Sequence, residues 1–175
     1  GVQTITRGDA RPSINIHPPW SPEAGTAFCE WLVTLPDTRP LSVTFANAIR
    51  DSTPTEPPSD GVLFRVWAGT DPTGADSRVI YENFTDAKAW APGEVDLSAF
   101  AGKTILLRLE SHPGPNKNTT CDSSYWAQPT VVAGSPPAPR KVSFQQATDE
   151  AVQAGRRIVE GTLKADERFT FLLGD

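Results

Sequence analysis

The chain of 175 residues carries 16 basic and 21 acidic side chains, a net charge of −5, and 38% of its residues are apolar. This balance allows one packed core but disfavours sequence-independent binding to nucleic acid, and no run approaches the ~18 consecutive apolar residues of a membrane span. The 17 prolines and 13 glycines exclude long helices and favour short strands joined by turns, because proline inside a helix costs about 3 kcal/mol.

Apolar and polar residues alternate in a series of short runs, each bounded by glycine, proline, aspartate or asparagine. In chain order the runs are INI (14–16), CEWLVTL (29–35), LSVTFA (41–46), GVLFRVWAG (61–69), RVIYENF (78–84), TILLRLE (104–110), TTCDSSYW (119–126) and TVVA (130–133). Seven or eight short strands without a helix of useful length predict an all-β fold, an antiparallel β-sandwich. A jelly roll is the commonest form of such a sandwich when the loops are long.

The period of two also assigns the residues of each strand to opposite faces. Trp31 falls on the apolar face of its strand, whereas Trp67 projects opposite the apolar residues of its own strand. Between the strands, EVDLSAFAGK predicts one helical turn that Asp96 caps and Gly102 ends. The residues predicted to face the core are Cys29, Trp31, Val33, Leu35, Leu41, Val43, Phe45, Val62, Phe64, Val66, Ile105, Leu107 and Leu109.

The composition changes after SPPAPR (135–140). SPPAPR reads as a stiff proline-rich linker, and residues 147–159 place apolar residues at helical spacing between the strand-like stretches KVSF and FTFLL. We therefore predict a β-sandwich module at 1–134, a linker at 135–140, and a C-terminal extension or the start of a following domain at 141–175. The sequence has no methionine, even at position 1, which favours a piece of a longer protein.

The sequence contains two histidines and two cysteines. His17 and His112 each follow a strand-like run and precede a proline, so they either end strands or border the rim of a ligand site. Two histidines without an HExxH motif or closely spaced cysteines fall short of a zinc site, and the residues that would bind a metal stay unknown. The spacing of Cys29 and Cys121 leaves open whether they are bridged or remain two buried thiols.

Motifs for catalysis are missing from the sequence. It lacks the G-x-S-x-G turn of hydrolases and the glycine-rich loops that bind nucleotides. Carboxylates that could cleave a glycosidic bond in pairs are available at Glu82, Glu94, Asp96 and Asp122. Asp96 is better explained as a helix cap and Asp122 as an acceptor at a strand end, so we expect no catalytic residues and no enzyme activity.

Three stretches together carry a resemblance to a known family: VTFANAIRD (43–51), GVLFRVWAG (61–69) and WAPGEVDLSAFAGKTILLRLESHPGPNKNTTCDSSYWAQP (90–129). Over residues 14–133 the chain resembles the galactose-binding-like β-sandwich family, which includes non-catalytic carbohydrate-binding modules of bacterial secreted proteins. The resemblance implies a jelly roll in which the loops at one end meet the sugar. A structural calcium is frequent in such modules, but no dense carboxylate cluster in the sequence places one, and we assign no cofactor.

Aromatic side chains are the first candidates for a sugar site, because sugar rings stack on aromatic faces through their C–H surfaces. Trp20 lies in a proline-stiffened loop, and Trp90 precedes a turn, where it suits a structural lid as well as a stacking platform. Polar loop residues would hydrogen-bond the sugar hydroxyls. The predicted ligand-binding residues are Trp20, Trp90, His17, His112, Asn116 and Trp67.

We therefore expect a non-catalytic carbohydrate-binding module of a larger secreted protein, with an extracellular or periplasmic location. The alternative is a structural or interaction domain that packs against a neighbouring catalytic domain and has no ligand of its own. The expected partners are a carbohydrate and a neighbouring domain of the same polypeptide, with no nucleic acid and no membrane span. A solvent-open aromatic favours the first function, and an apolar patch without one favours the second.

Overall fold

The computed structural model describes residues 2–19, 26–134 and 168–170. One 3-10 turn, η1 (Ser98–Phe100), is the helical element of this described part. The strands are β1 (Val2–Thr6), β2 (Ala10–Ile16), β3 (Ala27–Thr34), β4 (Leu41–Ile49), β5 (Val62–Gly69), β6 (Arg78–Thr85), β7 (Ala91–Asp96), β8 (Thr104–His112), β9 (Ser124–Ala133) and β10 (Arg168–Thr170).

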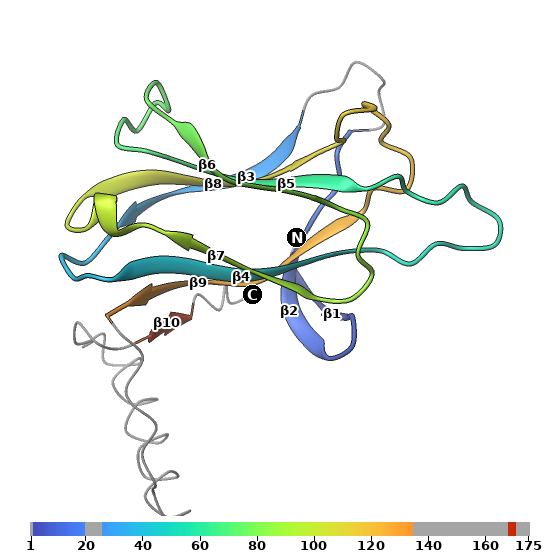
Figure 1. Cartoon of the computed structure of the whole chain (residues 1–175), viewed down its shortest axis with the longest axis horizontal. Helices are drawn as coiled ribbons and strands as arrows, with labels where there is room; N and C mark the ends of the chain where they lie inside the picture. The colour runs from blue at the N-terminus through green and yellow to red at the C-terminus, as the bar shows by residue number, and fades with distance from the viewer. Residues whose placement is uncertain (1, 20–25, 135–167, 171–175) are drawn as a thin grey trace, which may run out of the picture.

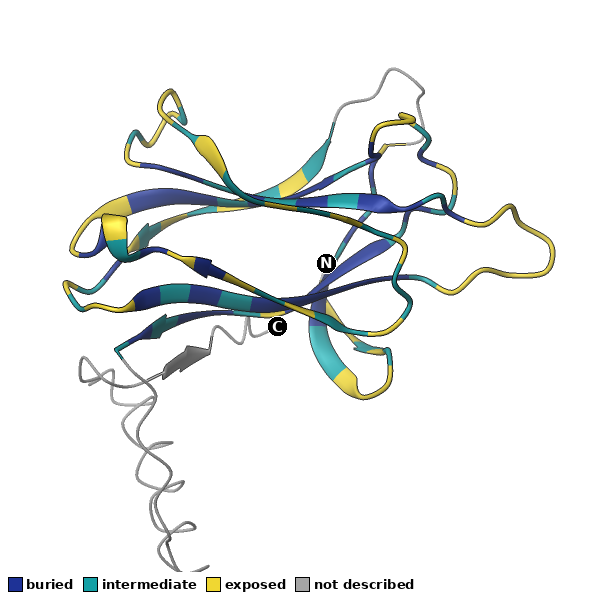
Figure 2. Ribbon diagram, in the orientation of Figure 1, coloured by how far each residue is buried: buried dark blue, intermediate teal, exposed yellow. Residues whose placement is uncertain are grey.

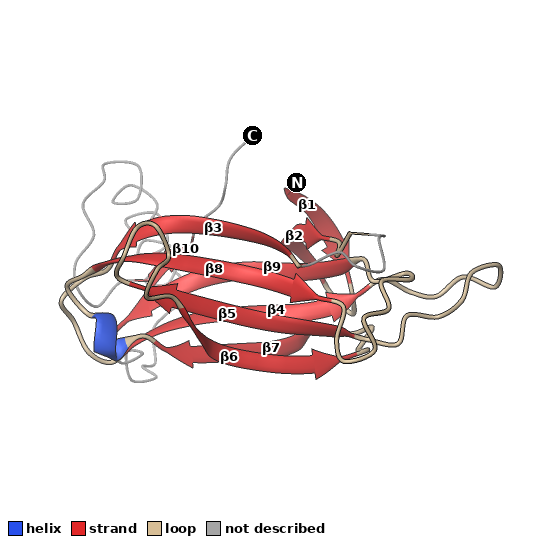
Figure 3. Cartoon of the chain, turned by 90° about the horizontal axis from the view of Figure 1, so that it is seen from above, coloured by secondary structure: helices blue, strands red, loops and turns tan. Residues whose placement is uncertain are grey.

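The strands form two antiparallel sheets. Sheet A has the order β1-β2-β9-β4-β7, with β10 also paired to β9, and sheet B has the order β3-β8-β5-β6. The two sheets lie on each other as two layers (Figures 1 and 3). The all-β antiparallel sandwich predicted from the alternation is confirmed.

The core lies between the two sheets. Figure 2 colours the buried residues dark blue, and they occur on strands of both sheets. The predicted inward residues of β5 and β8 lie there, and Phe64 and Ile105 have no exposed surface. Trp126 of β9 is also fully buried, with its ring centroid 4.9 Å from that of Phe45 in its own sheet and 5.3 Å from that of Phe64 in sheet B. Its indole Nε1 donates a hydrogen bond to Ser111 Oγ at 3.2 Å, so this large ring joins both sheets without leaving a buried donor unpaired.

The last strand differs from its prediction. TTCDSSYW and TVVA are predicted as separate runs, but SYW (124–126) and TVVA belong to one strand, β9, which begins at Ser124, and TTCDS (119–123) precedes it. A β-bulge joins them: Gln128 and Pro129 together lie opposite Phe45, where the pairing of β4 with β9 shifts register. Gln128 has φ 47°, a left-handed backbone that the alternation of side chains does not reveal.

Two strands, β1 and β7, were not predicted. β1 is mostly polar, as expected of an exposed ribbon, and β7 contains Pro92 and Gly93, which interrupt any apolar alternation. Gly93 is required because a Cβ there would lie 2.2 Å from the ring of Phe45. The chain turns from β1 to β2 through Arg7, Gly8 and Asp9, so this RGD sequence forms a hairpin turn.

The predicted helical turn is present as η1. Asp96 Oδ1 accepts a hydrogen bond from the backbone N–H of Ser98 at 2.8 Å, and Gly102 has φ 77° just beyond the turn. Leu97 is fully buried and Phe100 nearly so, which seals one end of the sandwich.

The predicted helix at 147–159 and the linker at 135–140 lie outside the described residues, and the domain boundaries stay a prediction. Within the extension, β10 pairs with β9 at Thr130–Val132, next to the stretch Ser124–Ala127 that pairs with β2. Cys29 and Cys121 are both free thiols. No helix of the described residues is long and apolar enough to cross a membrane.

We expect Trp126→Phe to lower the free energy of unfolding by about 1–3 kcal/mol, since it leaves a void in the core and removes the hydrogen bond that Trp126 donates to Ser111. Urea unfolding followed by circular dichroism measures the loss. Trp90→Phe is the matched control, because Trp90 is only half-buried. Equal losses in the two variants would show that Trp126 is not the centre of the core.

Candidate functional site

Three of the predicted site residues lie at the C-terminal ends of β2 and β8, toward the end of the sandwich at the right of Figure 1. His17 follows β2, His112 ends β8, and Asn116 lies in the loop after β8. The Nδ2 group of Asn116 donates to Asp60 Oδ2 at 2.8 Å, whereas the Nδ1 atom of His112 accepts from the backbone N–H of Gly114 at 3.0 Å. The two histidines therefore stand at strand ends, which is one of the two alternatives that the sequence predicted for them.

A buried carboxyl group, Asp122, lies at the same end. It is fully buried, and its Oδ1 atom accepts a hydrogen bond from Ser59 Oγ at 2.6 Å, while its Oδ2 atom has no hydrogen-bond partner in the described part of the chain. Burial raises the pKa of Asp122 to about 6, since the Ser59 hydrogen bond only partly offsets the loss of solvent. Among the charged neighbours, Asp60 raises this pKa, and His17 and Lys88 lower it.

The residues at this end were tested as a place for the calcium that the family resemblance implies. Asp122 Oδ2 and Asp60 Oδ1 are both buried oxygens without a hydrogen-bond partner in the described ranges, and carboxylate oxygens are the ligands that Ca²⁺ prefers. Ca²⁺ needs several further oxygen ligands, and no group of three or more His, Cys, Asp or Glu side chains in the described residues could hold a metal ion.

The predicted tryptophans lie in three different settings. Trp20 falls outside the described residues. Trp90 is held on the β1–β2 turn, where its Nε1 group donates to the carbonyl of Asp9 at 2.9 Å and the guanidinium of Arg11 lies 5.6 Å from its ring centre. Trp90 thus fastens a hairpin, whereas Trp67 lies on the outward side of sheet B.

The outward side of sheet B brings side chains from four strands into register. Trp67 and His112, both predicted to contact a ligand, lie on it. We call this surface the sheet B face, and its residues are Phe28, Glu30 and Leu32 of β3, Leu106, Arg108, Glu110 and His112 of β8, Leu63, Arg65 and Trp67 of β5, and Val79, Glu82 and Phe84 of β6.

The sheet B face exposes aromatic rings to solvent. Phe28 is 46% exposed and Phe84 is 43% exposed, although side chains of this kind are usually buried. Trp67 is half-buried, and its buried Nε1 atom has no hydrogen-bond partner among the residues that the structure describes. Trp67 therefore offers a ligand the carbon surface of its ring rather than its N–H group.

Charged side chains form two ion-pair groups between these rings. Arg65 donates from Nε to Glu82 Oε2 at 2.7 Å, and its NH1 group lies 3.5 Å from Glu110 Oε1. Arg108 contacts Glu30 Oε2 at 2.8 Å. The face therefore combines stacking surfaces with fixed donors and acceptors, which is the combination that sugar hydroxyls and C–H faces require.

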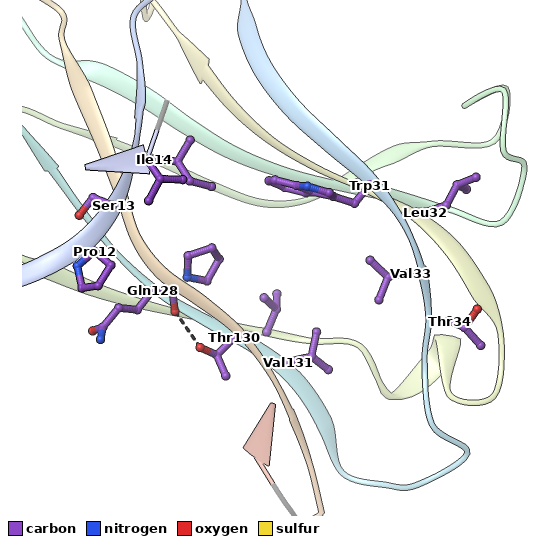
Figure 4. A pocket seen from close by; sticks show the side chains of 13 residues that line it. Pro12, Ser13, Ile14, Trp31, Leu32, Val33, Thr34, Gln128, Thr130 and Val131 are labelled. Atoms are coloured by element: carbon purple, nitrogen blue, oxygen red, sulfur yellow. Dashed lines mark hydrogen bonds between the residues drawn. The ribbon is translucent and has the colours of Figure 1, made fainter. Parts of the chain in front are cut away.

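A separate apolar cleft of about 320 Å³ opens along the side of the sandwich, between β3 of sheet B and the strands β2 and β9 of sheet A. We call it the edge cleft. Figure 4 shows Trp31 and Val33 of β3 on one side of it, and Thr130 and Val131 of β9 on the other. Trp31, which faces inward as predicted, thus lines a cleft as well as contacting the core.

Sequence reasoning missed the exposed rings of Phe28 and Phe84 and the whole edge cleft. The sequence does contain a signal for the exposed ring of Phe28. Phe28 and Leu32 occupy outward positions of β3, where polar residues are expected. No signal marks the cleft, because its walls come from strands that are far apart in the sequence.

No family model matches the sequence. An uncharacterized protein of Archaeoglobus fulgidus is 28% identical over 78 residues, which make up 41% of this chain and 19% of that protein. The chain therefore spans less than a fifth of the length of this relative.

Two solved structures are similar in fold. One is TmCBM61 in complex with β-1,4-galactotriose, with a TM-score of 0.44 and 12% identity over 73% of each chain. The other contains the CBM22-1 and GH10 modules of xylanase 10B of Clostridium thermocellum with xylohexaose, with a TM-score of 0.47 and 8% identity over 82% of this chain and 26% of that one. The β-sandwich itself is established by the pairing of the strands, and these two similarities carry no argument about a ligand.

The buried Asp122 predicts a pH-dependent stability. Its pKa is about 6 in the folded chain, whereas the ordinary value is 3.8. At a pH between these two values the folded chain therefore keeps a proton on Asp122 that the unfolded chain has lost. The free energy of unfolding should therefore fall as the pH rises from about 4 to about 7. Asp122→Asn keeps an acceptor for Ser59 and carries no charge, so it should be more stable than the unsubstituted chain at pH 8 by ~1–2 kcal/mol.

Urea unfolding between about pH 4.5 and 8 measures this slope. Asp96→Asn is the control of opposite sign, because hydrogen bonds from Ser98 lower the pKa of Asp96 and its substitution should cost stability at neutral pH. An unchanged slope in Asp122→Asn would contradict the raised pKa.

Proposed function

We propose that the chain is a non-catalytic carbohydrate-binding module and that the sugar chain binds across the sheet B face. The observation that supports this most is the meeting of three rings, Phe28, Trp67 and Phe84, with ion-paired arginines and glutamates on one open surface. With a polysaccharide as its ligand, the protein acts in the extracellular space or in the periplasm.

The rings supply the apolar part of the contact. Phe28 lies on β3 at one side of the sheet and Phe84 on β6 at the other, with Trp67 on β5, a strand between them. The rings stand at different levels along the strands, because Phe28 is level with Arg65, and Phe84 with Leu63. Three separate rings on one surface suit an extended chain of sugars better than a single sugar ring, since each aromatic can take a separate sugar unit. A shallow site of this type gives affinities in the range of about mM to µM.

The ion pairs supply the polar part. Arg65 and Arg108 are each held by a carboxylate, so their remaining N–H groups have fixed directions. A preorganised donor loses little entropy when a hydroxyl binds to it. His112, at the end of the face nearest the loops, adds a further ring nitrogen.

The carboxylates named as candidates for hydrolysis lie apart. Glu82 is ion-paired on the sheet B face, whereas Glu94 is exposed on β7 of sheet A. Asp96 binds the start of η1, and Asp122 is buried beside Ser59. A glycosidase needs two carboxyl groups facing each other across a cleft, and this arrangement favours binding without catalysis.

The test is Trp67→Ala, with retention on gels that contain soluble polysaccharide as the measurement. We expect the affinity to fall at least about tenfold, because the central stacking surface is lost. Trp90→Ala is the matched control and should bind normally, since Trp90 lies on the β1–β2 turn away from this face. Thermal unfolding verifies that both variants are folded.

If Trp90→Ala lost retention and Trp67→Ala kept it, the ligand would bind near Trp90 at the loop end, which would contradict the proposed site. Retention of the unsubstituted chain by no polysaccharide would contradict the proposed function itself.

The second candidate function, an interaction domain without a ligand, is favoured by the edge cleft. Val2 and Leu32 line this cleft, and they are 49% and 58% exposed. An apolar cleft with exposed apolar residues at its border suits the side chains of a neighbouring domain.

An apolar dye, 8-anilinonaphthalene-1-sulfonate, tests whether the edge cleft is open. Its fluorescence should rise with the unsubstituted chain and rise less with the double variant Val2→Ser and Leu32→Ser, which makes the border polar. Equal fluorescence with both proteins would remove the support for this candidate.

A further inference from the structure

The charges of the sheet B face indicate which class of sugar it accepts. Two guanidinium groups, those of Arg65 and Arg108, lie between three carboxylates, those of Glu30, Glu82 and Glu110. Every guanidinium contacts at least one carboxylate, and the carboxylates exceed them by one. The face therefore has an excess of negative charge, as does the whole chain with its net charge of −5.

Arg65 is the more enclosed of the two guanidinium groups. It lies between Glu82 on one neighbouring strand and Glu110 on the other, and Glu110 is only 3% exposed. An anion that bound Arg65 would have to displace one of these carboxylates or approach both of them. Removing a carboxylate from its partner leaves a buried charge unpaired, which is strongly unfavourable.

Arg108 is held in a different way. Its guanidinium bonds to Glu30 Oε2 and also lies 4.0 Å from the ring centre of Phe28. One side of the guanidinium plane is thus covered by an aromatic ring and one edge by a carboxylate. Little of its positive charge is left for a second anion.

His112 adds no positive charge to the face. Burial lowers its pKa, so the imidazole is neutral at pH 7. Its Nδ1 atom accepts the backbone N–H of Gly114, which leaves the proton on Nε2 as a neutral donor. The charged groups that act on this imidazole are Arg65, Glu110 and Glu82 of the face, and Lys117 of the loop after β8.

We propose that the sheet B face selects uncharged sugar chains and rejects chains that carry uronate or sulfate groups. This inference rests on the proposed function and deepens it. A hydroxyl group both donates and accepts, so it can bind a spare N–H of an arginine and a spare lone pair of its glutamate without separating the pair. A carboxylate or sulfate group only accepts, and it meets carboxylates that are already in place.

The experiment compares uncharged polysaccharides, such as galactan, xylan and β-glucan, with polygalacturonate and a sulfated galactan in affinity gels. The unsubstituted chain should be retained by at least one uncharged polysaccharide and bind the acidic ones at least about tenfold more weakly, at both ~20 mM and ~150 mM salt.

A double variant, Glu30→Gln and Glu82→Gln, tests the cause. It leaves Arg108 without its carboxylate partner and leaves Arg65 with Glu110 alone, so positive charge then exceeds negative charge on the face. The exposed rings stay in place, and both glutamates are partly exposed, so the fold should tolerate the change. We expect it to gain retention by polygalacturonate, and this retention should weaken as salt is added. Glu94→Gln is the control, because it removes an exposed carboxylate from sheet A instead.

The outcomes separate the two proposals. Stronger retention of the unsubstituted chain by an acidic polysaccharide than by every uncharged one would overturn this inference and leave the proposed function standing. Retention by neither class would overturn the proposed function. An equal gain in Glu94→Gln would show that the net charge of the chain, rather than the sheet B face, decides the selection.

Discussion

The fully buried ring of Trp126 fixes the two sheets face to face, because it contacts Phe45 in sheet A and Phe64 in sheet B. Its N–H group donates to Ser111, so the ring lies in the core without leaving a buried donor unpaired. Once the inward residues of β5 and β8 are fixed by this core, the residues between them must point outward. The sheet B face is therefore a direct consequence of how the core is packed.

Register across sheet B then determines the chemistry of that surface. The pairing of Arg65 with both Glu82 and Glu110, and of Arg108 with Glu30, places opposite charges directly across neighbouring strands. If the pairing shifted by one residue, these charges would be buried and the core residues exposed. The charged residues therefore fix the register of the strands as strictly as the apolar residues do. The surface that we propose for sugar binding and the surface that enforces strand pairing are the same.

Much of the fold could be predicted from the sequence, and the reason is visible in single residues. Strict alternation in β5 placed Trp67 outward, and the sequence around Asp96 and Gly102 predicted η1. The site was harder, because a hydrogen bond such as that from Trp90 to Asp9 joins residues 81 positions apart. Local patterns do not contain such pairings, so they could name Trp67 and His112 but could not show that Phe28 and Phe84 join them.

The bulge at Gln128 and Pro129 has a consequence for behaviour at high concentration. β4 pairs with one edge of β9. On the opposite edge, β2 pairs with Ser124–Ala127 and β10 with Thr130–Val132, so the bulge lies between the two paired stretches. Pro129 has no amide hydrogen to offer there, and the left-handed backbone of Gln128 turns the chain away from a regular ladder. A strand from another molecule thus finds no continuous row of partners along β9, and this protects the central strand of sheet A from intermolecular aggregation.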